Sequence, residues 1–130
     1  MKASDKIKYW QDIADYDLKT AAVMQKGRRY LYTVFMCQQA LEKLFKSIHM
    51  KKFSKEAPHS HNLVYLHSLL DISISDMQGK LIAELTTYYI EGRYPTYKKK
   101  LSTLVDGEKS ATLLKQTKEL YKWLKETLLT

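Results

Sequence analysis

One stretch of the chain, residues 30–48, limits the fold more than any other. Its apolar side chains recur at the three- and four-residue spacing of a helix: Leu31, Val34, Leu41, Phe45 and Ile48, with Phe35, Ala40 and Leu44 beside them. This apolar face is broader than a surface helix needs. We therefore expect one long helix here, at the centre of a helical bundle.

The composition agrees with an all-α chain that has one core. A length of 130 residues is enough for one ordinary domain and too short for two. The hydrophobic content of 45% is typical of a globular protein, and four glycines and two prolines allow few tight turns. We predict a single domain over residues 1–130, folded as a bundle of about five helices.

The remaining helices are predicted from apolar spacing and from residues that begin or end helices. They should cover residues 4–27, 61–70 and 75–92, and about 22 residues from position 106. Residues 49–61, which contain Pro58 and a basic run, should form a loop. Residues 93–100 should be extended or irregular, because Tyr94 precedes Pro95 and is pushed out of the helical conformation.

The single cysteine, Cys37, lies inside the central helix. It has no partner for an internal disulfide, and we interpret it as a small core residue. The chain shows no signal-peptide pattern and no apolar run approaching the ~20 residues that span a bilayer. We expect a soluble, cytoplasmic protein with no membrane partner.

The formal net charge of +8 favours a polyanionic partner such as RNA, DNA, a nucleotide or an acidic protein. The only arginines are Arg28, Arg29 and Arg93, and this scarcity argues against a sequence-specific reader of DNA. The sequence contains neither a nucleophile motif nor a glycine-rich phosphate loop. No cofactor is implied by these patterns.

The strongest candidates for a binding site follow the fourth predicted helix. They are Arg93, Tyr94, Tyr97, Lys98, Lys99 and Lys100. The cations can hold phosphates, and the tyrosine rings can stack on a base. Alternatively, the tyrosines cover the end of the bundle and the lysines belong to a solvated loop.

A second candidate is the polar group Gln38, Gln39, Glu42 and Lys43 on the central helix. These side chains could line a polar cleft. We favour the alternative that Glu42 is a structural anchor paired with Lys43, Lys46 or Arg93, since buried carboxylates are normally paired.

Two further patterns, a group of histidines and a stripe of lysines, are interpreted as structural features and not as binding sites. His59, His61 and His67 match no familiar zinc spacing, so we predict no metal site and place His61 at a helix start. A lysine stripe on the last predicted helix is interpreted as a solvated face, with contact to a phosphate backbone as the alternative. Its members are Lys115, Lys118, Lys122 and Lys125.

Four features of the chain, taken in order, resemble the HEPN domain, a small α-helical family of prokaryotes and higher eukaryotes. They are Trp10 with Asp17-Leu18 and Ala21, the run QQALEKLFKSI at 38–48, His61-Asn62-Leu63, and Tyr89 with Arg93-Tyr94-Pro95. The resemblance implies an up-and-down bundle that pairs as a homodimer and associates with a nucleotide or RNA. It also implies a minimal nucleotidyltransferase partner, in a toxin–antitoxin pair.

Some members of that family are metal-independent ribonucleases, in which a histidine follows an arginine by four to six residues. Here Arg93 is followed at those distances by Tyr97, Lys98 and Lys99. A lysine keeps its proton near neutral pH and cannot replace the imidazole in proton transfer. We therefore expect a non-catalytic nucleotide- or RNA-binding module. The alternatives are a ribonuclease toxin with an altered site at Arg93 and a protein-interaction bundle.

Overall fold

The computed structural model describes all 130 residues and contains six helices and no strand. The helices are α1 (Ala3–Lys26), α2 (Tyr30–Phe53), α3 (Leu63–Ser68), α4 (Asp76–Glu91), α5 (Pro95–Leu104) and α6 (Gly107–Leu128). The predicted all-α helical bundle is confirmed, with one helix more than expected. None of the six combines the length and apolarity that crossing a bilayer requires.

Short polar side chains fix where three of the helices begin. Asn62 accepts a hydrogen bond from the backbone N–H of Tyr65 at the start of α3. Ser75 and Gln78 form a reciprocal capping box at the start of α4. At α6, Asp106 accepts from the backbone N–H of Lys109. These starts lie where the sequence predicts them.

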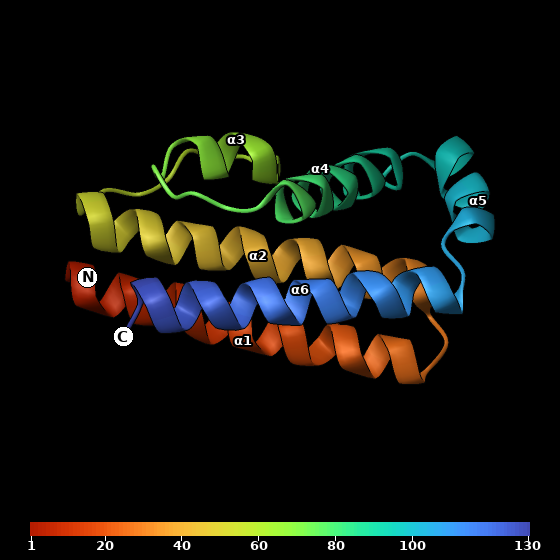
Figure 1. The fold of residues 1–130 in the computed structure, drawn as a ribbon, viewed down its shortest axis with the longest axis horizontal. Helices are drawn as coiled ribbons and strands as arrows, with labels where there is room; N and C mark the ends of the chain where they lie inside the picture. Colours follow the sequence, from red (N-terminus) through yellow and green to blue (C-terminus); the bar gives the residue numbers. More distant parts are fainter.

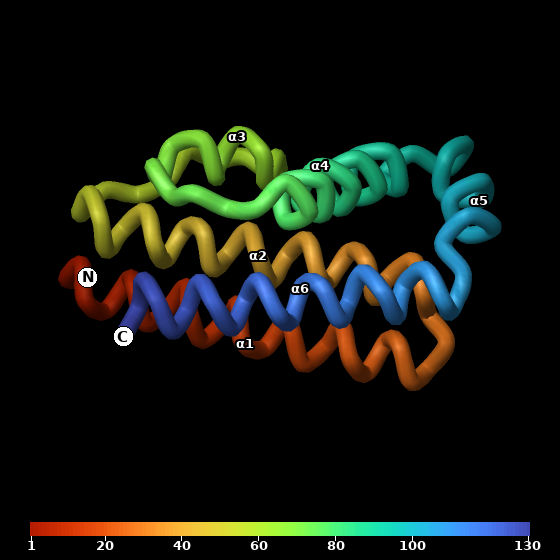
Figure 2. Tube along the Cα trace, viewed as in Figure 1, coloured from red at the N-terminus to blue at the C-terminus, as the bar shows by residue number.

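The central element is α2, as expected from its broad apolar face. In Figure 1, α1 and α6 lie along one side of α2, and α3 and α4 cover the other. Figure 2 shows the chain turning from α1 into α2 at the same end of the bundle where α5 crosses between α4 and α6; both termini lie at the opposite end. Every helix contacts α2. The core of 23 buried hydrophobic residues is therefore built around α2.

The apolar faces of α2 are covered within one chain. Leu44 and Phe45 are 0% and 1% exposed, although adjacent positions on a helix point in directions about 100° apart. The excess of apolar residues on this helix is thus explained by helices of the same chain and is not evidence for a second subunit.

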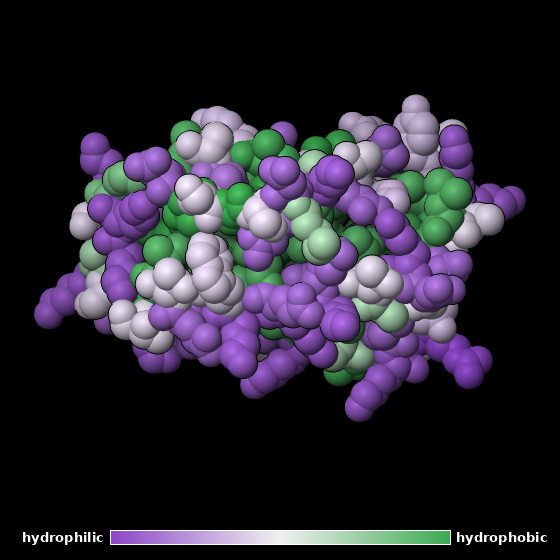
Figure 3. Space-filling view, in the orientation of Figure 1, coloured by the Kyte–Doolittle hydropathy of each residue, from purple (hydrophilic) through white to green (hydrophobic).

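Figure 3 shows hydrophilic side chains along the lower edge of the molecule and hydrophobic atoms between α3 and α6.

Two segments differ from the sequence prediction. Residues 49–53, expected to be in a loop, extend α2 as far as Phe53, because Met50 is still buried and Ser54 ends the helix in the left-handed conformation. Residues 95–100, expected to be extended or irregular, begin α5. Tyr94 is extended, as its neighbour Pro95 requires, but that proline then starts the helix, where its fixed φ is favourable.

Candidate functional site

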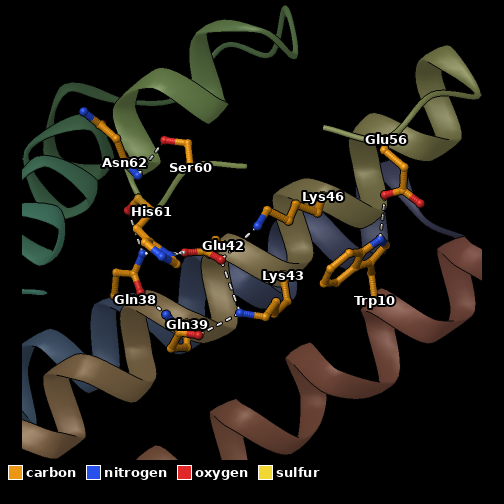
Figure 4. Close-up of polar contacts among 10 residues, drawn as sticks. All are labelled: Trp10, Gln38, Gln39, Glu42, Lys43, Lys46, Glu56, Ser60, His61 and Asn62. Carbon is orange, nitrogen blue, oxygen red and sulfur yellow. Dashed lines mark hydrogen bonds and ion pairs between the residues drawn. The ribbon is translucent and has the colours of Figure 1, made fainter. Parts of the chain in front are cut away.

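Glu42 is the centre of a buried polar network on α2. Its side chain is 1% exposed, and its carboxylate accepts hydrogen bonds from four donors. Oε1 lies 2.7 Å from Nδ1 of His61 and 3.1 Å from Nε2 of Gln38. Oε2 lies 3.0 Å from Nζ of Lys46 and 3.2 Å from Nζ of Lys43. Figure 4 shows these side chains converging on one carboxylate.

The network also binds the chain that leads into α3. Gln38 donates to the backbone carbonyl of His61 at 2.7 Å, and Gln39 donates to the side-chain oxygen of Gln38 at 2.8 Å. Lys43, which donates to Glu42, also donates a hydrogen bond to Oε1 of Gln39 at 2.7 Å. The structure thus brings Gln39, Glu42, Lys43 and His61 together. It places the lysines beside Glu42 and gives Arg93 no ion pair with it.

Two opposing effects set the pKa of Glu42. Burial alone raises it, but hydrogen bonds from His61 and Gln38, the charge of Lys43 and a hydrogen bond from Lys46 together hold the pKa below its usual range. Glu42 is therefore ionised at neutral pH. A carboxylate that stays charged while buried is a fixed anion, suited to orienting the imidazole of His61 rather than to accepting protons.

Tyr89 connects this network to the start of the basic segment. Its ring centroid lies 5.3 Å from that of His61. Burial raises the pKa of Tyr89, the charge of the Glu42 carboxylate raises it further, and the charge of Arg93 lowers it. Arg93 follows Tyr89 by four residues, about one helical turn. The sequence does not reveal this link, because His61 and Tyr89 belong to different elements of the fold.

The six basic and aromatic candidates are all exposed at one end of the bundle, from Arg93 through the first two turns of α5. The rings of Tyr94 and Tyr97 meet edge to face, with centroids 6.4 Å apart. Lys98 lies 4.9 Å above the ring of Tyr32 and donates a hydrogen bond to its hydroxyl. No acidic residue lies between positions 92 and 105. This end of the molecule is therefore strongly cationic.

Gly92 lies where α4 ends and this segment begins. Its backbone is in an ordinary helical conformation, so the reason for a glycine is space. A Cβ there would overlap the ring of Phe35 and lie 2.8 Å from the carbonyl oxygen of Tyr88. Phe35 in turn contacts Tyr32 and Tyr89 edge to face, at centroid distances of 5.5 and 5.7 Å.

A hollow of about 200 Å³ lies beside α5, where the turn between α1 and α2 approaches it. Arg28, Arg29 and Lys98 line it, together with Tyr30 and Tyr32. Sequence reasoning did not select Arg28 and Arg29. The sequence does show that two of the three arginines in the chain are adjacent. It does not show that they lie beside α5, because that depends on the fold.

The other residues weighed from the sequence have separate surroundings. His67 contacts the backbone carbonyl of Ile72 at 2.6 Å, away from His61. Lys125, in the lysine stripe of α6, pairs with Asp15 at 2.9 Å. The other three lysines of the stripe form no ion pair. Cys37 is buried in the core.

Comparison with known proteins gives two findings. The family model described as the HEPN domain matches residues 7–127. The fold is similar to that of a solved crystal structure of TT1696 from Thermus thermophilus, with a TM-score of 0.79 and 20% sequence identity. The similarity covers 93% of this chain and 97% of that one. No curated protein matches the sequence.

Proposed function

Since this chain belongs to the HEPN domain family, we propose that it is a non-catalytic module that binds a nucleotide or RNA. The observation that supports this most is the exposed end of the bundle, where Arg93 and three consecutive lysines, Lys98 to Lys100, lie beside the rings of Tyr94 and Tyr97. Cations contact phosphates, and aromatic rings stack on bases whatever their sequence.

The absence of an imidazole in this segment supports a binding role over cleavage. Proton transfer near neutral pH needs a group that titrates there, and lysine does not unless it is strongly desolvated. Lys98 and Lys99, at positions where a histidine would be required, are exposed to solvent. Their exposed ammonium groups are suited to contacting phosphate.

The test is the affinity of a short fluorescent RNA for the Arg93→Ala protein. We expect weaker binding, a salt dependence reduced by about one unit of slope, and an unchanged helical circular dichroism spectrum. Lys122→Ala, which removes an exposed cation from α6, is the matched control and should bind like the wild type. Equal affinity of the Arg93→Ala and wild-type proteins would remove Arg93 from the site.

We also propose that the module works with a minimal nucleotidyltransferase, as one half of a toxin–antitoxin pair. The support is the family assignment together with the +8 charge, which suits an acidic partner. Capture of the tagged chain from its native cells should bring down such an enzyme in stoichiometric amount. Recovery of the chain alone would contradict this part of the proposal.

A homodimer is proposed on the same family grounds, and the outer face of α1 offers a surface for it. Tyr9, Tyr16 and Val23 recur every seven residues and are 51%, 73% and 63% exposed. A heptad stripe of this kind is typical of helix-to-helix association. Light scattering should give a dimer for the wild type and a monomer for Tyr16→Lys. A monomeric wild type at high protein concentration would refute it.

One arrangement favours a second candidate function, metal-independent cleavage of RNA. His61 is held at Nδ1 by Glu42, its side chain is 45% exposed, and its ring lies 5.3 Å from that of Tyr89, four residues before Arg93. An imidazole oriented in this way can exchange protons with RNA while an arginine holds the phosphate. Cleavage in the presence of a metal chelator, lost in His61→Gln, would establish this activity in place of the non-catalytic role.

A further inference from the structure

We infer that the hollow between the α1–α2 turn and α5 is a binding site for a phosphate monoester, the group at the end of a nucleotide or of an RNA strand. The choice of this ligand class rests on the proposed function. The site itself rests on three cations that the fold gathers around one small space, and neither Arg28 nor Arg29 belongs to the basic segment considered above.

The cations come from distant parts of the sequence. Arg28 and Arg29 lie in the turn between α1 and α2, and Lys98 lies in the first turn of α5. Neither arginine takes part in an ion pair, and none of the eight residues lining the hollow is acidic. Three unneutralised charges around one space repel each other, and an anion placed between them removes that repulsion.

The neutral groups complete a binding site. Leu31 and Val105, 6% and 1% exposed, form an apolar floor. The Tyr32 hydroxyl accepts a hydrogen bond from Lys98, which leaves its own proton free to be donated to a phosphate oxygen. The guanidinium groups of Arg28 and Arg29 each carry paired N–H donors, whose geometry matches the oxygens of a phosphate.

The size and charge of the hollow select the class of phosphate. A volume of about 200 Å³ is below that of a site enclosing a whole drug-sized molecule, so it fits one group of a larger ligand. A monoester carries about two negative charges at pH 7, whereas a linking phosphodiester carries one. Three cations match the monoester better. The exposed segment from Arg93 onward then contacts the rest of the ligand.

The backbone at Arg28 determines where its side chain leaves the end of α1. Its φ is 60°, in the left-handed region that favours glycine and is unfavourable for most other residues. Gly27, next to it, has an ordinary φ of −78°. Arg28 is instead the left-handed residue that closes α1, because the N–H of Arg29 donates to the carbonyl oxygen of Met24 at 2.9 Å across the turn. The end of the helix therefore explains the backbone conformation, and the exposed arginine side chain is left beside the hollow.

The first experiment uses inorganic phosphate as the probe and follows backbone amides of the full chain by NMR. Shifts confined to residues 28–32 and 98–102, and abolished in Arg28→Gln/Arg29→Gln, would support the site. Lys19→Gln/Lys122→Gln loses the same charge from exposed positions on α1 and α6 and should respond like the wild type. Shifts spread over all basic surfaces, or no shifts, would overturn the inference.

The second experiment separates the two sources of the group by comparing AMP with adenosine, and a 5′-phosphorylated RNA with the same RNA ending in a hydroxyl. The phosphorylated member of at least one pair should bind about tenfold tighter or more, and the preference should vanish in the double-arginine variant. If both members of each pair bind equally, the inference fails and the proposed function stands. If phosphate binds in the hollow but no nucleotide or RNA does, the site stands and the proposed function fails.

A single variant distinguishes binding from a merely structural role. Arg28→Gly removes the backbone strain and should raise the unfolding temperature by about 3 °C while weakening phosphate binding. A structural arginine would give lower stability on replacement. Higher stability with unchanged phosphate affinity would exclude Arg28 from the site.

Discussion

Nδ1 of His61 lies 2.7 Å from Oε1 of Glu42, a contact that joins the segment before α3 to the middle of α2. The two residues are 19 positions apart in the sequence, and the partners of the carboxylate are otherwise all on α2. The contact therefore fixes the loop after α2 against the core. The buried Glu42 carboxylate thus has two roles: it neutralises the lysines beside it on α2, and it holds the loop that contains His61.

Glu42→Gln should lower the free energy of unfolding by about 3–5 kcal/mol, because it leaves Lys46, also buried, without its counter-ion. Urea denaturation followed by circular dichroism measures this change. The control is Asp12→Asn, which breaks the exposed pair with Lys8 and should leave the urea midpoint unchanged. Equal midpoints for the Glu42→Gln and wild-type proteins would show that the network does not anchor the fold.

The same carboxylate gives the stability a definite pH dependence. The folded pKa of Glu42 lies below its unfolded value of about 4.3, so the unfolded chain binds more protons in this range. The stabilisation is therefore complete above the unfolded pKa and is lost as the pH falls through the folded one. The difference in urea midpoint between the wild type and Glu42→Gln should shrink steadily on acidification. A difference independent of pH would contradict the assignment.

Replacing two glycines by alanine should change the stability of the protein in opposite directions. Gly92→Ala should destabilise the protein by about 1–3 kcal/mol, because the new methyl group overlaps Phe35. Gly79→Ala, in α4, meets nothing within 4 Å and should stabilise it by about 0.5–1 kcal/mol. Thermal unfolding of the two variants checks both signs. If Phe35→Leu fails to relieve the Gly92→Ala defect, the ring is not the cause.

Cys37 should be unreactive in the folded protein. Burial raises the pKa of its thiol to about 12, and only the thiolate attacks a disulfide reagent. Ellman's reagent should therefore label Cys37 at the rate at which the protein unfolds, and at once in denaturant. Labelling of the native chain at the rate of an exposed thiol would show that α2 is not packed as described.

Local patterns predicted most of the helices. The apolar spacing of residues 30–48 located the central helix, and Ser75 and Asp106 marked the beginnings of α4 and α6. The prediction was wrong at Pro95. A proline keeps the residue before it, here Tyr94, out of the helical conformation, and we wrongly expected the residues after it to be non-helical as well. A proline disfavours a helix before itself but is well suited to starting one. The basic segment is therefore partly a helix, with its cations on a regular scaffold.

The candidate site was predictable only where its members are close in sequence. Gln38, Glu42, Lys43 and Lys46 share one helix, so their spacing already brings them together. The hollow combines Arg28 with Lys98, which are 70 positions apart, and no periodicity or motif links them. Its existence depends on how α5 crosses the end of the bundle, a tertiary property.

The chain enters that crossing beside Phe35, whose ring occupies the place where any other residue at position 92 would have its Cβ. A half-buried ring on α2 and a glycine after the end of α4 are therefore matched to each other, three residues before α5 begins. A larger side chain at position 92 requires a smaller one at position 35, although neither residue is among those proposed to contact a ligand. The exposed segment is thus constrained by a pair of residues that its ligand does not touch.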